Sequence, residues 1–342
     1  MSRLVMGCDV HLDTIAAAVV DGTGAEIEGV TVPNTVTGWE QLTGLVADYQ
    51  IGTVGIEGAS GFGRRFAATL VAADIEVREV PTRLTARQRR TDGAGKTDPG
   101  DARTIARATA RGQGSRWTND DTLETVRVLH VRREHLVNTQ TADINQLRAL
   151  IVELDPAIAS ELKRLRSARD FRTLTTFEFP TNTRHQSTVV GLIRSIAQDC
   201  LDRLDQIRLL ERQLETVMPP AGNALIATLT GCSTVTAARI LAEIAGTDRF
   251  GTDAKMAAWA GTAPLDASSG RQQRHRLNRG GNRQVNRALH TIIVTQTRHG
   301  GEAAHYLTRR LHEGKTRREA IRAAKRHLTR RIWKILHTHQ LT

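Results

Sequence analysis

Short apolar runs follow one another in a fixed order through the first eighty residues, and this order restricts the possible folds more than any other feature. Runs of four to eight residues bounded by turn residues are typical of strands, whereas apolar residues three and four positions apart are typical of amphipathic helices. Strand character is found at Leu4–Val10, Thr14–Val20, Ala25–Pro33, Thr53–Glu57 and Ile75–Val80, and helical spacing at Gly38–Tyr49 and Gly63–Ala73. The chain therefore begins with an α/β domain.

A last helix of this domain is expected after Pro99, because proline is favourable at the first position of a helix. The resulting order is three strands, a helix, a strand, a helix, a strand and a final helix. This is the order of the ribonuclease H-like fold, of which RuvC-like domains are one form, and we assign it to residues 1–118. Because one fold hosts many functions, the fold by itself predicts no chemistry.

The chain changes character beyond Asp120. Apolar residues recur at three- and four-residue steps from Leu123 to Ile151, which predicts a long amphipathic helix. A polar stretch follows at 155–187, and helical spacing resumes over Val189–Val217. Two long helices suggest a coiled-coil hairpin that packs on itself or meets a partner subunit, and an intramolecular helical bundle is the alternative. We assign residues 119–218 to this helical coiled-coil and dimerisation region.

The last part of the chain, residues 219–342, is predicted to be helical and is strongly basic. From Arg271 to Thr342 there are 18 Lys and Arg residues against three Glu, a net charge of +15, whereas the whole chain carries +12. A basic region beside a near-neutral one is typical of a protein with a polyanionic partner, because cationic side chains that neutralise phosphates release counterions. Nucleic acid is the expected partner, and an Arg-rich solvated surface is the alternative.

Residues 225–245 resemble a helix-hairpin-helix, in which a glycine-containing turn lets backbone N–H groups approach a phosphate. The turn contains Gly231, but Ser233 stands where such hairpins usually have a second glycine. A phosphate-binding hairpin and a plain helical turn therefore both remain open.

Several classes of protein are excluded by what the chain lacks. The three cysteines, Cys8, Cys200 and Cys232, are far apart, and the histidines of the basic region form no compact ligand set, so a zinc site is not expected. No apolar run approaches the roughly 20 residues needed to span a bilayer, and the N-terminus has no long apolar segment. We expect a reduced, cytoplasmic protein with no membrane partner.

Four carboxylates fall at matching places in the predicted α/β domain. Asp9 and Glu57 each end a strand, at the carboxyl edge where open α/β sheets place their sites. Asp98 and Asp101 open the last helix and share one of its faces. Clustered carboxylates would repel one another without a cation, and their oxygens are the ligands that Mg²⁺ prefers. The set predicts a Mg²⁺ site, in which Mn²⁺ is also possible, suited to phosphodiester chemistry.

Each carboxylate also has a purely structural explanation. Asp98 before Pro99 is a good helix N-cap, and Asp101 at the third helical position favours the helix start as well. Asp9 is explicable as a turn residue at a strand end and Glu57 as a surface acid. Their joint occurrence at two strand ends and one helix start is what favours the metal site.

The chain resembles the IS one-ten group of insertion-sequence transposases, whose RuvC-like domain carries a D-E-D-D tetrad. The resemblance covers nearly the whole sequence. It is carried by Gly7-Cys-Asp9-Val-His11, Gly55-Ile-Glu57-Gly-Ala-Ser-Gly61, Lys96-Thr-Asp98-Pro-Gly-Asp101-Ala, Leu229–Ala237, Ala260-Gly-Thr-Ala-Pro264, Ser268-Ser269-Gly270 and Arg279-Gly-Gly-Asn282-Arg283. It identifies Asp9, Glu57, Asp98 and Asp101 as the tetrad.

The resemblance further implies that Ser269, with Ser268 as the alternative, attacks a DNA phosphate and forms a phosphoserine link beside the metal-bound tetrad. It implies donor and target DNA, a structured noncoding guide RNA, a homodimer or homotetramer, and a bacterial, nucleoid-associated protein. Where some relatives have Gly or Lys after Ser-Gly, this chain has Arg271-Gln272, which keeps the basic character. The expected nucleic-acid contacts are Lys96, Arg271, Arg274, Arg276, Arg279 and Arg283.

Three other functions are alternatives. A Holliday-junction-type nuclease would use the same tetrad with water as the nucleophile. An actin-like sugar or acetate kinase would need glycine-rich phosphate loops, which Cys8–Leu12 lacks. A non-catalytic nucleic-acid-binding scaffold would bind DNA equally well with and without Mg²⁺. The first of these is the principal alternative to a transposase.

Overall fold

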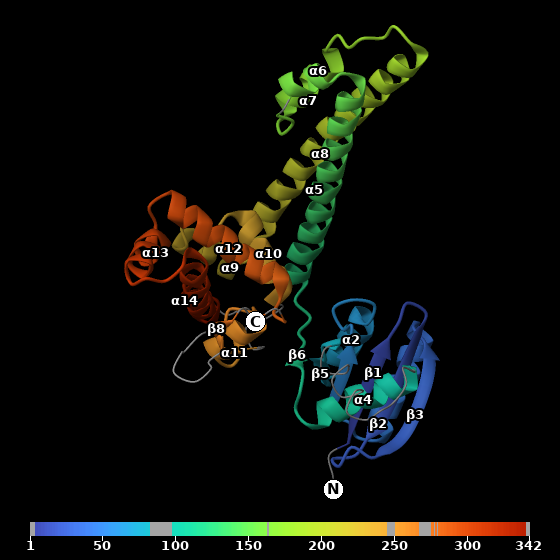
Figure 1. Cartoon of the computed structure of the whole chain (residues 1–342). Helices are drawn as coiled ribbons and strands as arrows, with labels where there is room; N and C mark the ends of the chain where they lie inside the picture. Colours follow the sequence, from blue (N-terminus) through green and yellow to red (C-terminus); the bar gives the residue numbers. More distant parts are fainter. Residues whose placement is uncertain are drawn as a thin grey trace. The chain divides into compact units, whose positions relative to one another are not determined.

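The computed structural model of this chain describes residues 4–82, 98–162, 164–244, 250–266, 275–276, 278 and 280–339. Two compact units are formed (Figure 1). The first is built mainly from Met1–Asp120, with Ile244–Thr252 and Gln340–Thr342 assigned to it, and the second from Asp121–Glu243 and Asp253–His339.

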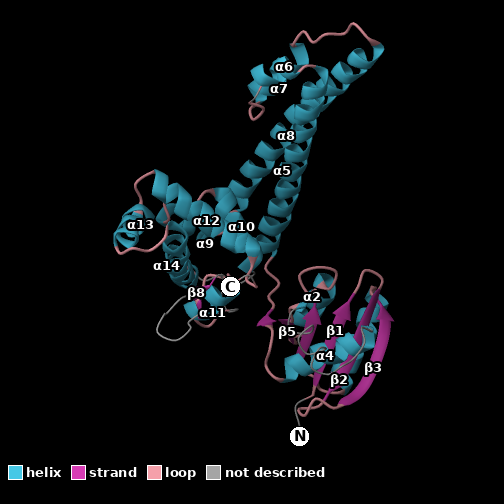
Figure 2. Ribbon diagram, in the orientation of Figure 1, coloured by secondary structure: helices cyan, strands magenta, loops and turns pink. Residues whose placement is uncertain are grey.

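The first unit contains a six-stranded mixed sheet (Figure 2). Its strands are β1 (Val5–Val10), β2 (Thr14–Val20), β3 (Glu26–Pro33), β4 (Thr53–Glu57), β5 (Glu76–Glu79) and β6 (Ser115–Arg116), in the order β3-β2-β1-β4-β5-β6. Strand β2 is antiparallel to both β1 and β3, whereas β1, β4 and β5 are parallel to one another. Strand β6 is antiparallel to β5. This is the ribonuclease H-like order, so the predicted fold is confirmed. Strand β6 was not predicted, because two residues are too short to show a periodicity.

Helices cover both faces of this sheet. Helices α1 (Val36–Asp48) and α2 (Arg64–Ala72) cover one face, where their apolar side chains pack with Met6, Cys8 and Ile56 in the main core of the unit. Helix α4 (Asp98–Ala110) covers the other face, towards which Gly7 and Gly55 point. Successive residues of a strand point to opposite faces, so Cys8 and Asp9 lie on different sides of the sheet, as the alternation predicted.

Small residues let α4 lie very close to the sheet. A Cβ atom on Gly7 would stand 2.1 Å from the backbone nitrogen of Ala106, and one on Gly55 would stand 1.8 Å from the Thr109 hydroxyl. The contacts also fix the direction of the helix. Ala102 packs with Ala16 and Ala18, near the carboxyl end of β1, whereas Ala106 packs with Val5 at its start. Helix α4 therefore runs antiparallel to β1, with its N-terminus at the carboxyl edge of the sheet.

The second unit contains a long helical hairpin. Helices α5 (Asp121–Leu154) and α8 (Arg184–Val217) pack along each other, as expected of a hairpin that packs on itself (Figure 1). The connection holds two helices that were not predicted, α6 (Pro156–Glu161) and α7 (Ala168–Thr176). It is polar overall, but Phe171 and Leu174 of α7 are fully buried against the hairpin. Helix α8 begins at Arg184 rather than Val189, because Thr183 forms a capping box there.

The remainder of the second unit is mostly helical, as predicted. Its elements are α9 (Pro220–Thr228), α10 (Thr234–Ile244), α11 (Asp253–Trp259), the two-residue strands β7 (Leu265–Asp266) and β8 (His275–Arg276), α12 (Arg283–Arg298), α13 (Glu302–His312) and α14 (Arg317–Thr338). Strands β7 and β8 pair in antiparallel fashion, with Leu265 opposite Arg276, where only a loop was expected. No helix in the described part of the chain is both long and apolar enough to cross a membrane.

Candidate active site

Two of the predicted carboxylates are neighbours on adjacent strands. Asp9 of β1 and Glu57 of β4 are register partners in the parallel ladder, so their side chains leave the same face of the sheet at its carboxyl edge. Strands in such a ladder lie about 4.8 Å apart. Asp9 is only 8% exposed and Glu57 is half-buried. The sheet therefore brings together two acids that are 48 positions apart in the sequence.

The third carboxylate belongs to the helix that covers this same face. Asp101 lies in the first turn of α4 and is 6% exposed. Its neighbour Ala102 packs on Ala16, which is the register partner of Asp9. Because α4 runs antiparallel to β1, its acidic first turn lies at the carboxyl edge of the sheet, where Asp9 and Glu57 are found. A buried carboxylate at a helix N-terminus is also stabilised by the helix dipole.

Asp98 begins α4, but its side chain lies outside the described residues. Within the part of the chain that is described, no three acidic, histidine or cysteine side chains stand close enough together to hold a metal ion. The chemistry of the donors nevertheless suits a hard divalent cation, since Asp9, Glu57 and Asp101 offer only carboxylate oxygens. Two of these three are buried, where an acid usually has a charged or hydrogen-bonding partner.

His11 is a further residue of this edge that the sequence did not single out. Its Nε2 lies 3.3 Å from Oδ2 of Asp9, and its side chain is 51% exposed. The signal was its position, because His11 follows β1 directly and is only two residues from Asp9. On the other face, burial raises the pKa of the Cys8 thiol well above its usual range, with a smaller contribution from the charge of Asp9. Cys8 is therefore an inert core residue.

A further acid, Glu79, ends the third parallel strand but does not belong to this group. It pairs with Ile56, whose side chain lies in the core on the α1 and α2 side. Its Oε2 instead accepts hydrogen bonds from the backbone nitrogen and the hydroxyl of Ser60, both at 2.9 Å. Glu79 thus holds the turn that follows Glu57, and it does so from the face of the sheet covered by α1 and α2.

Most of the predicted nucleic-acid contacts, and both candidate serines, lie outside the described residues. This applies to Lys96, Ser268, Ser269, Arg271, Arg274 and Arg279, and to the side chain of Arg276 in β8. The paired strands β7 and β8 flank the segment that carries the two serines. Arg283 is described: it is the first residue of α12, is exposed, and lines a cavity that also involves α14.

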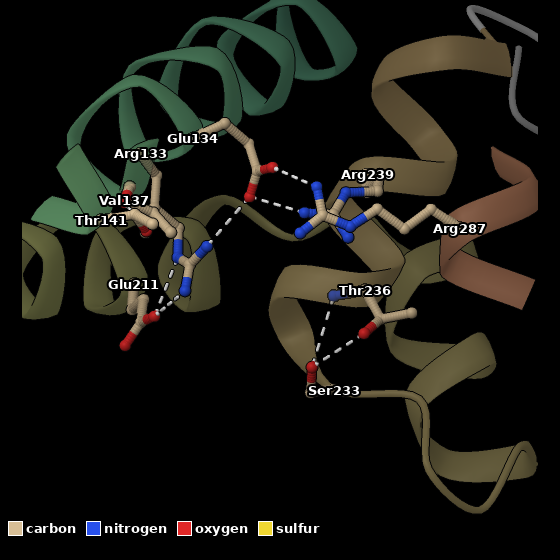
Figure 3. Close-up of polar contacts among 9 residues, drawn as sticks. All are labelled: Arg133, Glu134, Val137, Thr141, Glu211, Ser233, Thr236, Arg239 and Arg287. Carbon is tan, nitrogen blue, oxygen red and sulfur yellow. Dashed lines mark hydrogen bonds and ion pairs between the residues drawn. The ribbon is translucent and has the colours of Figure 1, made fainter. Parts of the chain in front are cut away.

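The predicted helix-hairpin-helix corresponds to α9, a tight turn and α10. Gly231 has a φ of +84°, and a Cβ there would stand 2.8 Å from Thr295 of α12, so glycine is needed for both reasons. The Ser233 hydroxyl accepts a hydrogen bond of 3.3 Å from the Thr236 nitrogen and caps the start of α10 (Figure 3). Ser233 has a structural role as a cap, and phosphate binding by this turn stays a prediction.

A buried ion network that the sequence did not predict joins α5 to α10 and α12 (Figure 3). The Glu134 carboxylate lies 2.6 Å from the Arg239 guanidinium, 3.2 Å from that of Arg133 and 3.7 Å from that of Arg287. Arg133 also pairs with Glu211 of α8 at 2.6 Å. Arg239 and Glu134 are almost buried, whereas the Arg287 side chain is 61% exposed. The network fixes the hairpin to the helices that follow it.

Comparisons with known proteins give matches in both halves of the chain. A family model described as "Transposase" matches residues 6–156, which contain all four predicted carboxylates. A second, described as "Transposase IS116/IS110/IS902 family", matches residues 223–308, which contain Ser269 and Arg283. Among solved structures, T. thermophilus RuvC in complex with Holliday junction substrate is similar at 12% identity and a TM-score of 0.28, over 33% of this chain and 99% of that one. No curated protein matches this chain.

Proposed function

Because this chain belongs to the IS116/IS110/IS902 family of transposases, we propose that it cuts and rejoins DNA with a metal-bound tetrad of Asp9, Glu57, Asp98 and Asp101 and with Ser269 as nucleophile. The observation that carries the first half is the register pairing of Asp9 with Glu57, together with the acidic first turn of α4 on the same face. The principal substrates are donor and target DNA.

The protein residues of this edge have separate tasks in the proposal. Asp9, Glu57, Asp98 and Asp101 would hold Mg²⁺ or Mn²⁺, and the low exposure of Asp9 and Asp101 would keep bulk water away from the ligands. When bound, such an ion supplies Lewis-acid polarisation of a phosphoryl oxygen. His11, 3.3 Å from Asp9, would orient that carboxylate by hydrogen bonding. The sheet supplies rigidity, since two ligands lie on paired strands.

Ser269 is assigned to the attack on phosphorus. Its Oγ would form a bond to the phosphorus atom and give up its proton to solvent, while one phosphorus–oxygen bond to deoxyribose breaks. The leaving oxygen would take a proton from solvent and become a DNA hydroxyl. The resulting phosphoserine link conserves the energy of the broken bond for the rejoining step. Support comes from the position of Ser269 in the second matched family region, between the paired strands β7 and β8. Ser268 is the alternative nucleophile.

Selection of the DNA sequence is assigned to a structured RNA that pairs with donor and target. Aromatic residues make up 4% of the chain, which offers few platforms for stacking bases, whereas the region from Arg271 carries a charge of +15. This composition suits binding of phosphates, with base reading left to pairing. A dimer or tetramer would place the serine of one subunit beside the tetrad of another.

The decisive experiment is in-vitro recombination with the element's RNA and labelled donor and target DNA. We expect Mg²⁺-dependent recombinant product, its loss in Asp9→Asn and Ser269→Ala, and a protein–DNA adduct on denaturing gels that Ser269→Ala does not form. Ser268→Ala is the matched control and should keep both adduct and product. Normal recombination by Ser269→Ala would refute the assignment of Ser269 as the nucleophile. Cleavage without any adduct would favour the nuclease that uses water.

A further inference from the structure

A basic cavity lies in the second unit, apart from the carboxylates. It has a volume of about 660 Å³, within the range of roughly 300–1,000 Å³ that is usual for ligand sites. It is lined by Asn278, Gly281, Arg283, Asn286, Arg287, His290 and Lys325. No acidic residue is found among these lining residues. The charged side chains that line the cavity, Arg283, Arg287 and Lys325, are therefore all cationic.

The spacing of residues along α12 gathers these side chains. Arg283 is three and four residues before Asn286 and Arg287, and His290 is four and three residues after them, so all four share one face of the helix. The other face, with Val285, Leu289 and Ile292, is buried in the protein. Lys325 of α14 reaches the same cavity, and its Nζ donates a hydrogen bond of 2.8 Å to Oδ1 of Asn286. Two helices thus build the cavity.

The wall of the cavity is held by backbone contacts. Gly281 packs against Gly261, where an added Cβ would stand 2.2 Å from the backbone, and the Asn282 nitrogen donates to the Trp259 carbonyl at 2.7 Å. The Asn278 side chain accepts from the Gly280 nitrogen at 3.0 Å. These contacts fix the turn that precedes α12, so the cavity is formed before a ligand arrives.

The cations of the cavity are poorly neutralised by the protein itself. Among the described residues, neither Arg283 nor Lys325 forms an ion pair with a carboxylate. Arg287 lies 3.7 Å from Glu134, with its side chain 61% exposed, and Glu134 is also engaged by Arg239 at 2.6 Å. Burial lowers the pKa of Lys325, because its ammonium group loses water without gaining an anion. An anionic ligand would offset that cost.

The helix itself favours an anion. Helix α12 has 16 residues and no acidic residue in its first turn, and its first residue, Arg283, lines the cavity. The partial positive charge of a helix N-terminus adds to the three cationic side chains. Arginine is also suited to a phosphate because its planar guanidinium can donate two parallel hydrogen bonds. Phosphate oxygens are the acceptors that match this set.

We propose that this cavity binds a backbone phosphodiester of the transposase's nucleic acid, with Arg283, Arg287 and Lys325 as its cationic ligands. The proposal rests on the proposed function for the identity of the polyanion, which is DNA or RNA with the same phosphate chemistry. Asn278 follows β8 by two residues, so one wall of the cavity is close in the protein sequence to the segment that carries Ser269. A phosphate held here would anchor the nucleic acid to this part of the chain. Arg287 would exchange its long contact with Glu134 for the phosphate.

The test is the salt dependence of binding by the full chain, measured by fluorescence anisotropy without divalent ions. The probes are a random-sequence DNA duplex and a random-sequence RNA hairpin. We expect Arg283→Gln and Lys325→Met each to weaken binding several-fold. Each should also lower the slope of log affinity against log salt by about 1, the change expected for one lost phosphate contact.

The matched control is Arg298→Gln, which removes the same charge from the other end of α12. Arg298 is exposed and lies about 22 Å along the helix axis from Arg283, at 1.5 Å per residue. Its variant should keep the affinity and slope of the parent. If the slope changes with only one probe, the cavity binds that kind of nucleic acid. If the slope changes with both probes, the cavity accepts the backbone of either DNA or RNA.

The proposal would be overturned if Arg283→Gln and Lys325→Met gave the same slope of log affinity against log salt as Arg298→Gln. Arg283 is exposed, so its variant keeps the test valid even if Lys325→Met does not fold. Because binding is measured without divalent ions, this result is independent of catalysis. Failure of the proposed function would instead appear as absent recombination by the parent protein, whatever the slopes show.

Discussion

Two glycines determine how closely helix α4 approaches the sheet. Gly7 and Gly55 are register partners on β1 and β4, and each stands two residues before a carboxylate of the site. A side chain at either position would overlap with the backbone of α4 or with Thr109. The distance of Asp101 from Asp9 and Glu57 therefore depends on residues that have no chemical function of their own.

Replacement of Gly7 by alanine tests this dependence. The added Cβ would lie 2.1 Å from the Ala106 nitrogen, so we expect the free energy of unfolding to fall by about 1–3 kcal/mol, the usual cost of overpacking. Chemical denaturation measures the change. Gly52→Ala is the control, because nothing lies within 4 Å of its Cβ position and its effect should stay within about 0.5 kcal/mol. Equal stability of the two variants would show that α4 is not held in this way.

His130 of α5 gives the second unit a predictable response to pH. Burial lowers its pKa to about 4 from a usual value of 6.5, and its Nδ1 has no hydrogen-bond partner among the described residues. The unfolded chain therefore binds a proton below pH 6.5 that the folded chain takes up only near pH 4. Stability is unaffected above pH 6.5 and is lost as the pH falls through this window.

The histidine's share of this loss is on the order of 3 kcal/mol, at 1.36 kcal/mol per pKa unit. We expect the free energy of unfolding of the parent to fall more steeply between pH 6.5 and about 4 than that of His130→Gln, which cannot titrate. Urea unfolding across this range measures both slopes. Parallel curves for the two proteins would contradict the assignment.

At the scale of elements, three separate segments contribute to the carboxyl edge of the sheet. Strands β1 and β4 place Asp9 and Glu57, and α4 places its acidic first turn, while Glu79 of β5 holds the turn after β4. The three segments are connected through long stretches of chain. A ligand that contacts all of them should therefore stabilise the unit by linking them.

Divalent ions are expected to provide that link. Addition of Mg²⁺ or Mn²⁺ at one hundred times its dissociation constant should raise the free energy of unfolding by about 2.7 kcal/mol, and a chelator should reverse the gain. Calorimetry with and without the ion measures this. Asp9→Asn should lose the gain, and Asp13→Asn, which removes an exposed acid from the turn between β1 and β2, should keep it. A gain that persists in Asp9→Asn would place the ion elsewhere.

At the scale of the whole molecule, the first matched family region covers most of the first unit and continues into helix α5 of the second, whereas the other matched region lies mostly in the second unit. The carboxylates belong to the unit built mainly from Met1–Asp120, whereas the cavity and the strands flanking Ser269 belong to the other. The proposed reaction needs both. The proposed oligomer would supply them from different subunits.

Mixing of two inactive variants tests this division of labour. In the proposed mechanism, Asp9→Asn lacks the metal site and Ser269→Ala lacks the nucleophile. A mixed oligomer would then contain one intact pair if the site forms between subunits. We expect the mixture to recover part of the recombination activity, while each variant alone gives none. A mixture of Asp9→Asn with Glu57→Gln is the control and should remain inactive. No recovery in the first mixture would indicate a site formed within one chain.

The sequence determined the order of the strands, because buried strands need apolar runs of a recognisable length bounded by turn residues. It also pointed to Asp9, Glu57, Asp98 and Asp101, since acids at strand ends and at a helix start stand out from apolar surroundings. What it could not reveal was the role of Gly7 and Gly55, because a missing side chain carries no signal until the partner helix is known. Helices α6 and α7 were missed for a related reason: a few buried residues anchor an otherwise polar connection.

Only the tertiary structure decided which distant residues meet. The pairing of Asp9 with Glu57 follows from strand register, and the rejection of Glu79 from that group follows from the face on which its ladder partner lies. The Glu134 network and the basic cavity unite residues from helices far apart in the chain. Local patterns determine the faces of single elements, but charges act over a few ångströms in space, and those distances are determined only by packing.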